Sequence, residues 1–137
     1  MADIKLDLTS FNNALTRLAE GITRYQQDIS DTQIRDGLIQ RFEFTYEISH
    51  KMLKRYLEIA SATPEIIDGM AFADLIRTGN EQGLLLNNWP IWKKYREMSG
   101  KTSHTYDEEI ALKVVACIPE FLHEAMFLCQ KIREKQL

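Results

Sequence analysis

The sequence predicts an all-α protein, an antiparallel up-and-down helical bundle of four to five helices. Apolar residues recur at three- to four-residue steps through long stretches of the chain, as on the buried face of a helix. No stretch shows the strict apolar–polar alternation of a half-buried strand. Short polar breaks separate the periodic stretches. We expect residues 1–137 to form one domain, because 137 residues suit a domain of ordinary size.

The first two helices are expected over 9–27 and 32–60. Thr9 or Ser10 can cap the first, and a core stripe follows at Phe11, Leu15, Leu18 and Ile22. The second helix places a line of polar residues opposite its apolar side: Asp36, Gln40, Glu43, Glu47, His50 and Lys54. Glu43 and Glu47 are candidate paired carboxylates of a binding site. A solvated helix face is the simpler interpretation of the same pattern.

Two further helices are expected between 63 and 98. Thr63-Pro64-Glu65 is a helix start with a cap, a proline at the first helical position and then an acid. That helix should extend to about Gly83, with an interruption near Gly69. The next begins at Asn88-Trp89-Pro90 and places Trp89, Trp92 and Tyr95 on one face. Such a cluster is more often core than a base-stacking platform.

The last helix is expected from Thr105 to Lys135, with Thr105 and Glu108 forming a capping box. Its apolar stripe is regular, but Phe127 falls outside it, on a polar side with Glu120, Glu124 and Lys131. An exposed phenylalanine on a long helix is a candidate subunit contact.

Composition narrows the function classes. The formal net charge of −3 argues against non-specific coating of nucleic acid. Cys117 and Cys129 lie on one helix, about 18 Å apart, beyond disulfide reach. We therefore expect a reduced, cytoplasmic protein without a signal peptide or membrane span. No ligand spacing indicates a metal, and we expect no cofactor.

The polar turn at 96–108 is the main candidate site. His104 precedes the expected cap, where the helix dipole favours a neutral imidazole and hence a general base. The free N–H groups of the helix start, with Lys101 and Arg96, are suited to hold a phosphate. On these grounds alone, a surface histidine without function is the more common case.

Two blocks carry a resemblance to a known family: Phe-Glu-Phe-Thr-Tyr-Glu (42–47) and Ser-His-Thr-Tyr-Asp-Glu (103–108). In this order, with Ile76-Arg77, Gly83-Leu84 and Trp92 between them, they resemble the nucleotidyltransferase substrate-binding protein family of the HEPN superfamily. The resemblance covers about 8–135. It implies a dimerising helical bundle that works with a separate small nucleotidyltransferase, usually encoded beside it. The Gly-Ser and paired-aspartate motif of such enzymes is absent from this sequence.

The wider superfamily includes metal-independent ribonucleases, whose motif is an arginine, four to six residues, then a histidine, often followed two residues later by a tyrosine. His104 and Tyr106 match its second half. The position five before His104 is Ser99, and Arg96 lies eight before it, outside the usual spacing. A serine cannot stabilise charge developing on a phosphate. In related pairs the partner modifies this tyrosine with AMP, so the resemblance makes Tyr106 a candidate acceptor.

The leading interpretation is a non-catalytic, substrate- or nucleotide-binding and assembly subunit of a two-component, toxin–antitoxin-like nucleotidyltransferase system. A homodimer or higher oligomer is expected, with nucleotide or RNA bound near His104, Tyr106, Lys101, Glu43 and Glu47. The alternative is a HEPN ribonuclease toxin, neutralised by its partner, with His104 and Arg96 as candidate catalytic residues. A helical protein without a ligand site is the third interpretation.

Overall fold

A computed structural model describes residues 5–137, which are helical throughout apart from short connections and contain no strand. The predicted all-α class is confirmed. The elements are α1 (Thr9–Gln27), α2 (Thr32–Ala60), α3 (Pro64–Asp68), α4 (Phe72–Glu81), α5 (Trp89–Gly100), the 3-10 turn η1 (Thr102–His104) and α6 (Glu108–Lys135).

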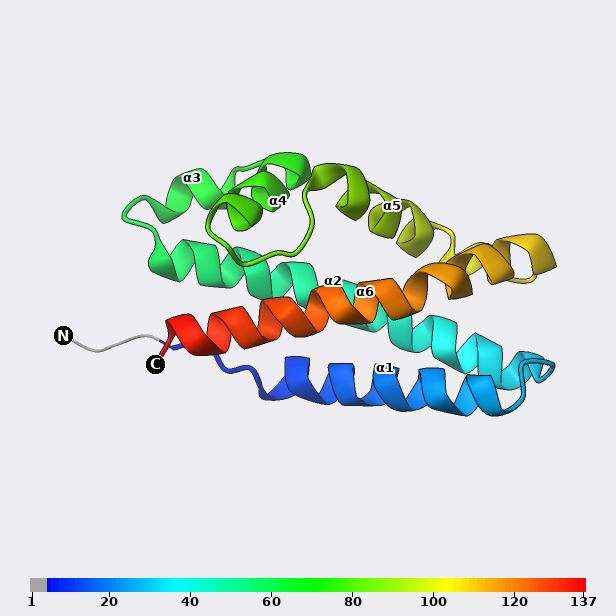
Figure 1. Cartoon of the computed structure of the whole chain (residues 1–137). Helices are drawn as coiled ribbons and strands as arrows, with labels where there is room; N and C mark the ends of the chain where they lie inside the picture. Colours follow the sequence, from blue (N-terminus) through cyan, green and yellow to red (C-terminus); the bar gives the residue numbers. More distant parts are fainter. Residues whose placement is uncertain (1–4) are drawn as a thin grey trace.

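The three long helices, α1, α2 and α6, pack against one another, and α3, α4 and α5 cover α2 and α6 on the other side (Figure 1). The chain runs up α1, down α2, back through α3 to α5, and down α6, which is the predicted up-and-down topology. The segment before α1 contacts the end of α6, where the side chain of Gln136 bonds both the N–H and the carbonyl of Leu6, at 2.6 and 3.2 Å.

The expected bounds of the first two helices are confirmed. The α2 cap is Asp31, whose carboxylate accepts from the N–H groups of Gln33 and Ile34. The helix expected over 63–83 is interrupted where predicted: α3 ends at Asp68, and Gly69 follows as its C-cap. The connection after α4 turns at Gly83, whose φ of +77° favours glycine.

An aromatic core joins α2, α5 and α6. The ring of Phe121 packs edge-on against Phe42 and Tyr95, with centroids 5.2 Å away in both cases, and against Trp92 at 6.0 Å. Edge-to-face pairs of this kind add about 0.5–1.5 kcal/mol each to the gain from burial. Trp92 and Tyr95 are buried, so their interpretation as core residues is confirmed.

The position of Glu124 contradicts the expectation that it faces solvent. Its side chain is fully buried, and its carboxylate accepts hydrogen bonds from the backbone N–H groups of Leu86 and Asn87, at 2.7 and 3.0 Å. These hydrogen bonds of Glu124 connect the segment between α4 and α5 to α6.

The structure also corrects the expectation for Phe127. This side chain is half-buried rather than exposed, with the ammonium of Lys131 5.3 Å from its ring centroid.

Two further sequence expectations concern membrane spans and disulfide bonds. Within residues 5–137, no helix is both long and apolar enough to cross a bilayer. Cys117 and Cys129 are free thiols. Burial raises the pKa of the Cys117 thiol to about 12, so this thiol stays protonated at neutral pH.

Candidate functional site: the turn before α6

A series of local hydrogen bonds holds the turn between α5 and α6. The N–H of His104 donates to the carbonyl of Lys101 at 3.0 Å, and the N–H of Asp107 donates to the carbonyl of His104 at 3.1 Å. The hydroxyl of Thr102 donates to the carbonyl of Ser99 at 2.9 Å. These bonds close η1 and connect it to the end of α5 and the start of α6.

The predicted capping box at Thr105 and Glu108 is wrong. The cap of α6 is Asp107, whose carboxylate accepts from the N–H groups of Glu109 and Ile110 at 3.0 and 3.3 Å. The Thr105 hydroxyl donates instead to the carbonyl of Thr102 at 3.2 Å. An aspartate is at least as good a cap as a threonine, and the 3-10 turn occupies the residues before it. His104 therefore lies three residues before the cap, not directly beside it.

The side chain of Glu108 pairs with Arg35 of α2. Arg35 Nη1 lies 2.7 Å from Glu108 Oε1, and this contact holds the pKa of the Glu108 carboxyl below its usual value. Arg35 is 6% exposed, and its Nε atom has no hydrogen-bond partner within the described residues. The pair fixes the base of the turn to the first turns of α2.

His104 and Tyr106 lie together on the outer side of this turn. Their ring centroids are 6.2 Å apart and nearly perpendicular, at 71°. Both side chains are exposed, and Tyr106 is 87% accessible. Lys101, the C-cap of α5, is half-buried. The structure thus brings three predicted residues to one exposed turn, within reach of a partner.

Neither the position of Ser99 nor that of Arg96 places a positive charge beside His104. Ser99 is half-buried in the last turn of α5. The guanidinium of Arg96 lies over the ring of Phe72 in α4, 5.0 Å from its centroid. Across residues 5–137, no hydrogen bond or ion pair joins Arg96 to His104. The structure therefore separates these two candidate catalytic residues.

Glu43 and Glu47 are exposed on α2, away from the point where the turn touches that helix. The turn meets α2 at Arg35, and Glu43 and Glu47 follow it by about 12 and 18 Å along the helix axis. Glu47 pairs with Lys51 at 3.9 Å, the pair that their four-residue spacing predicts, and lies 3.4 Å from His50 Nε2. Glu47 thus belongs with His50 rather than with the turn.

His50 is the residue that the sequence pattern named without giving it a role. Its ring lies between Tyr46, at 5.2 Å, and the edge of Phe72, at 5.4 Å. Burial lowers the pKa of His50, and the carboxylate of Glu47 opposes that effect. Burial also raises the pKa of the Tyr46 phenol to about 12. Contacts between α2 and α4 build this group, and no spacing within the sequence indicates them.

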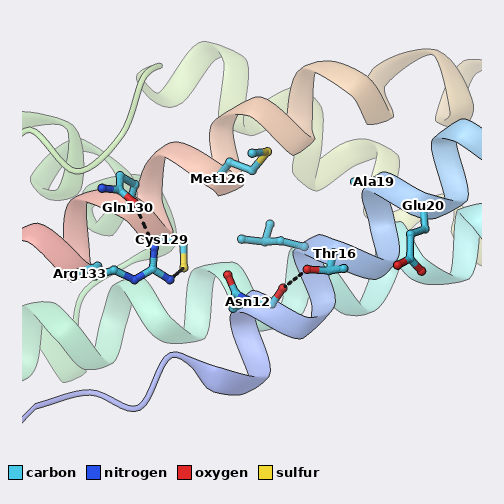
Figure 2. Close-up of a pocket in the computed structure, with 9 residues that line it drawn as sticks. Asn12, Thr16, Ala19, Glu20, Met126, Cys129, Gln130 and Arg133 are labelled. Atoms are coloured by element: carbon cyan, nitrogen blue, oxygen red, sulfur yellow. Dashed lines mark hydrogen bonds between the residues drawn. The ribbon is translucent and has the colours of Figure 1, made fainter.

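A groove of about 500 Å³ runs between α1 and α6 (Figure 2). Its floor is largely apolar, from Leu15, Ala19 and Met126, and Met126 is 52% exposed. Glu20 lies at one end and Arg133 at the other. In the part of the chain that the structure describes, no three His, Cys, Asp or Glu side chains lie close enough to hold a metal ion.

Comparison with known protein families shows to which family this chain is related. Residues 6–134 match the model of the family described as "Nucleotidyltransferase substrate binding protein like". The chain belongs to the nucleotidyltransferase substrate-binding protein family. This confirms the resemblance carried by the blocks at 42–47 and 103–108.

Individual relatives agree with this family. A Haemophilus influenzae protein named "Probable ribonuclease HepT" is 41% identical over 107 residues, which is 78% of this chain and 72% of the relative. The solved structure of HI0074, also from Haemophilus influenzae, superposes with a TM-score of 0.86 at 33% identity and covers 93% of this chain and 99% of that one. It is described as the fold of a substrate binding domain of a nucleotidyltransferase. A structure from Thermus thermophilus follows, with a TM-score of 0.73, 27% identity, and coverage of 90% and 98%.

Proposed function

We propose that this chain is the non-catalytic, substrate- or nucleotide-binding and assembly subunit of a two-component nucleotidyltransferase. The family match over 6–134 is the observation that carries the proposal. The sequence lacks the Gly-Ser and paired-aspartate motif of the transferase itself, so a second protein has to supply the transfer chemistry. In this proposal residues 1–137 act as one domain and bind without a metal or cofactor.

The exposed turn is the surface offered to the partner. Tyr106 projects into solvent beside His104, on a turn fixed by Asp107 and by the Arg35–Glu108 pair. A rigid, exposed phenol is accessible to an enzyme that transfers AMP to hydroxyl groups. Tyr106 is the proposed acceptor, and Lys101 and His104 are the proposed contacts to nucleotide at this turn. Glu43 and Glu47 are proposed as substrate contacts on α2, at a distance from this turn.

We further propose that two copies assemble through the groove between α1 and α6, rather than through Phe127. The groove has an apolar floor, an acid at one end and a base at the other (Figure 2). A two-fold axis across its middle places Glu20 of one copy beside Arg133 of the partner subunit, and the reverse contact forms at the other end. The two exposed Met126 side chains then cover each other.

Co-purification tests the assembly. The chain, carrying an affinity tag, is expressed with the nucleotidyltransferase encoded beside it, and the eluate is passed over a gel-filtration column. The expected result is one peak that contains both proteins. Two separate peaks at micromolar concentration contradict the proposal. Glu120→Ala, an exposed position of α6 outside the turn, serves as the control and should co-purify as wild type does.

The second candidate function is a HEPN ribonuclease toxin that its partner neutralises. The name of the Haemophilus influenzae relative favours it, as does the pairing of His104 with Tyr106. Two observations argue against the ribonuclease function: Ser99 occupies the position where the motif has arginine, and the guanidinium of Arg96 lies over Phe72. RNA cleavage by the chain alone distinguishes the two functions.

A further inference from the structure

A second surface, where α2, α4 and α5 meet, combines unpaired cations with half-exposed aromatic rings. Trp89, Lys93 and Arg96 follow one another on one face of α5 at steps of four and three residues. Trp92 and Tyr95, on the adjoining side of the helix, are buried. Lys93 and Arg96 are exposed, and Trp89 is only half-buried against the core, so part of each side chain is open to a ligand.

The cations on this surface differ from their neighbours in having no counter-charge. Lys51, Lys54 and Arg77 each lie within 4.0 Å of a carboxylate, of Glu47, Asp68 and Asp74 respectively. No carboxylate in residues 5–137 lies within ion-pair distance of Lys93 or Arg96. Both side chains are exposed. Two adjacent cations without a partner are suited to bind an anion.

Arg96 is held in place by a ring rather than by an acid. Its guanidinium lies 5.0 Å above the centroid of Phe72, and the indole of Trp89 packs edge-on against the same ring at 5.8 Å. Stacking on one face of the guanidinium leaves its N–H edges free to donate to a phosphate or carboxylate. Trp89 is half-buried, so part of its indole is open to solvent.

His50 adds an oriented acceptor to the same surface. Its Nε2 atom lies 3.4 Å from Glu47 Oε2, which leaves Nδ1 as the ring nitrogen without a side-chain partner among the described residues. The ring packs edge-on against Phe72, the residue that also carries Arg96. One ring, Phe72, therefore sets the positions of the histidine, the arginine and the tryptophan.

The spacing of these groups indicates the class of ligand. Trp89 and Arg96 are seven residues apart, roughly 10 Å along the helix axis. An aromatic ring at one end and cations at the other match a molecule with a planar base and a phosphate. Stacking of a base on an indole tolerates any base, because every base has a π-face.

We propose that Trp89, Lys93, Arg96 and His50 form a binding site for a nucleoside monophosphate. The base lies against Trp89, the phosphate lies between Arg96 and Lys93, and Nδ1 of His50 accepts a hydrogen bond from a hydroxyl or amino group of the ligand. This inference rests on the proposed nucleotide-binding role and assigns the nucleotide that the chain binds by itself to this surface, whereas the turn at His104 contacts a nucleotide only when the transferase presents it. The turn is then left to the protein partner.

The three histidines of the chain allow a direct test, because His50 lies in this site, His104 in the turn and His123 on the exposed side of α6. AMP is titrated into the wild-type chain, and the imidazole resonances are followed by NMR. We expect the His50 signals to shift and saturate, while those of His104 and His123 stay unchanged. Shifts confined to His104, or no shift at millimolar AMP, overturn the proposal.

Calorimetry of variants gives a second measurement. Arg96→Gln and Trp89→Leu are each expected to weaken AMP binding roughly tenfold or more, since each removes one end of the site. The matched control Arg77→Gln removes an exposed arginine of α4 that already has a partner, and it should bind AMP as wild type does. Adenosine and ribose 5-phosphate should each bind more weakly than AMP. Wild-type affinity in Arg96→Gln overturns the proposal.

The AMP titration and the co-purification experiment test the two proposals separately. If AMP shifts His50 while the nucleotidyltransferase fails to co-purify, this site stands and the assembly proposal fails. If the nucleotidyltransferase co-purifies but AMP shifts none of the three histidines, the assembly proposal stands and this site is wrong.

Discussion

Oε1 of Glu124 accepts hydrogen bonds from both the backbone and the side-chain N–H groups of Asn87, at 3.0 and 3.1 Å. Its other oxygen accepts from the N–H of Leu86 at 2.7 Å. A single buried carboxylate of α6 thereby satisfies the polar groups of the connection that leads into α5. α5 carries Trp89 and Arg96 and ends at the turn that contains His104. This contact therefore helps to position both the proposed nucleotide site and the turn.

Replacing Glu124 with alanine should destabilise the protein by about 3 kcal/mol, because it removes the buried acceptor of three hydrogen bonds. Urea unfolding followed by circular dichroism measures this change. Glu120→Ala, an exposed neighbour on the same helix, is the control and should change stability by about 0.5 kcal/mol or less. Equal effects of the two substitutions would show that the Glu124 contacts contribute little.

The titration of Glu124 should also be visible in stability. Burial raises the pKa of this carboxyl above its ordinary 4.5, against the opposing effect of its hydrogen bonds. The folded state then holds the proton at pH values where the unfolded state has lost it, so stability falls as pH rises through that window. Glutamine at this position does not titrate.

Urea unfolding of wild type and Glu124→Gln between about pH 4 and pH 7 isolates this effect, since the other groups titrate alike in both proteins. We expect the stability of wild type relative to Glu124→Gln to decrease as pH rises above 4.5. A difference that stays constant, or that increases with pH, contradicts the raised pKa.

Arg35 should control the rigidity of the turn without touching its exposed residues. Arg35→Met keeps a long side chain but removes the partner of Glu108, so we expect the turn to open more often. Limited trypsin digestion with mass spectrometry should then show severalfold faster cleavage after Lys101. Lys113→Ala, which removes only an exposed pair with Glu109, is the control and should leave that rate unchanged.

Met126→Glu should prevent the proposed dimer from forming and leave a monomer, because it places a charge on the floor of the groove between α1 and α6. The side chain is 52% exposed in the single chain, so the fold itself should tolerate the change. Light scattering measures the mass. Ile66→Glu, an exposed apolar position on α3 outside the groove, should remain dimeric. A dimer in both variants, with a monomer from Phe127→Asp, would move the interface to Phe127.

Most of the fold could be predicted from the sequence because its helices are long and strongly periodic. The bounds of α1 and α2 follow from apolar steps and from the polar break around Asp31. The start of α6 could not be predicted as well, since Thr105 and Asp107 are both good caps and only the structure shows that η1 precedes the second. The charge of Glu124 predicts an exposed position, although its spacing from Phe121 and Leu128 puts it on the buried face.

The candidate site was only partly predictable. The exposed pair of His104 and Tyr106 follows from a polar turn between two patterned helices. The partnership of Arg35 with Glu108 joins residues 73 positions apart, and nothing local in the sequence indicates it. The grouping of His50, Phe72 and Arg96 depends on how three helices pack. Contacts of this kind appear only once the packing is known.

The most direct test of the central claim is RNA cleavage by the purified wild-type chain, compared with cleavage by His104→Ala purified in the same way. The claim is that the chain binds and assembles but does not catalyse, because Ser99 replaces the motif arginine and Arg96 is held against Phe72. We predict the same background cleavage of a structured RNA by both proteins, in the absence of the nucleotidyltransferase. Cleavage by wild type that His104→Ala abolishes would contradict this account and establish the ribonuclease function.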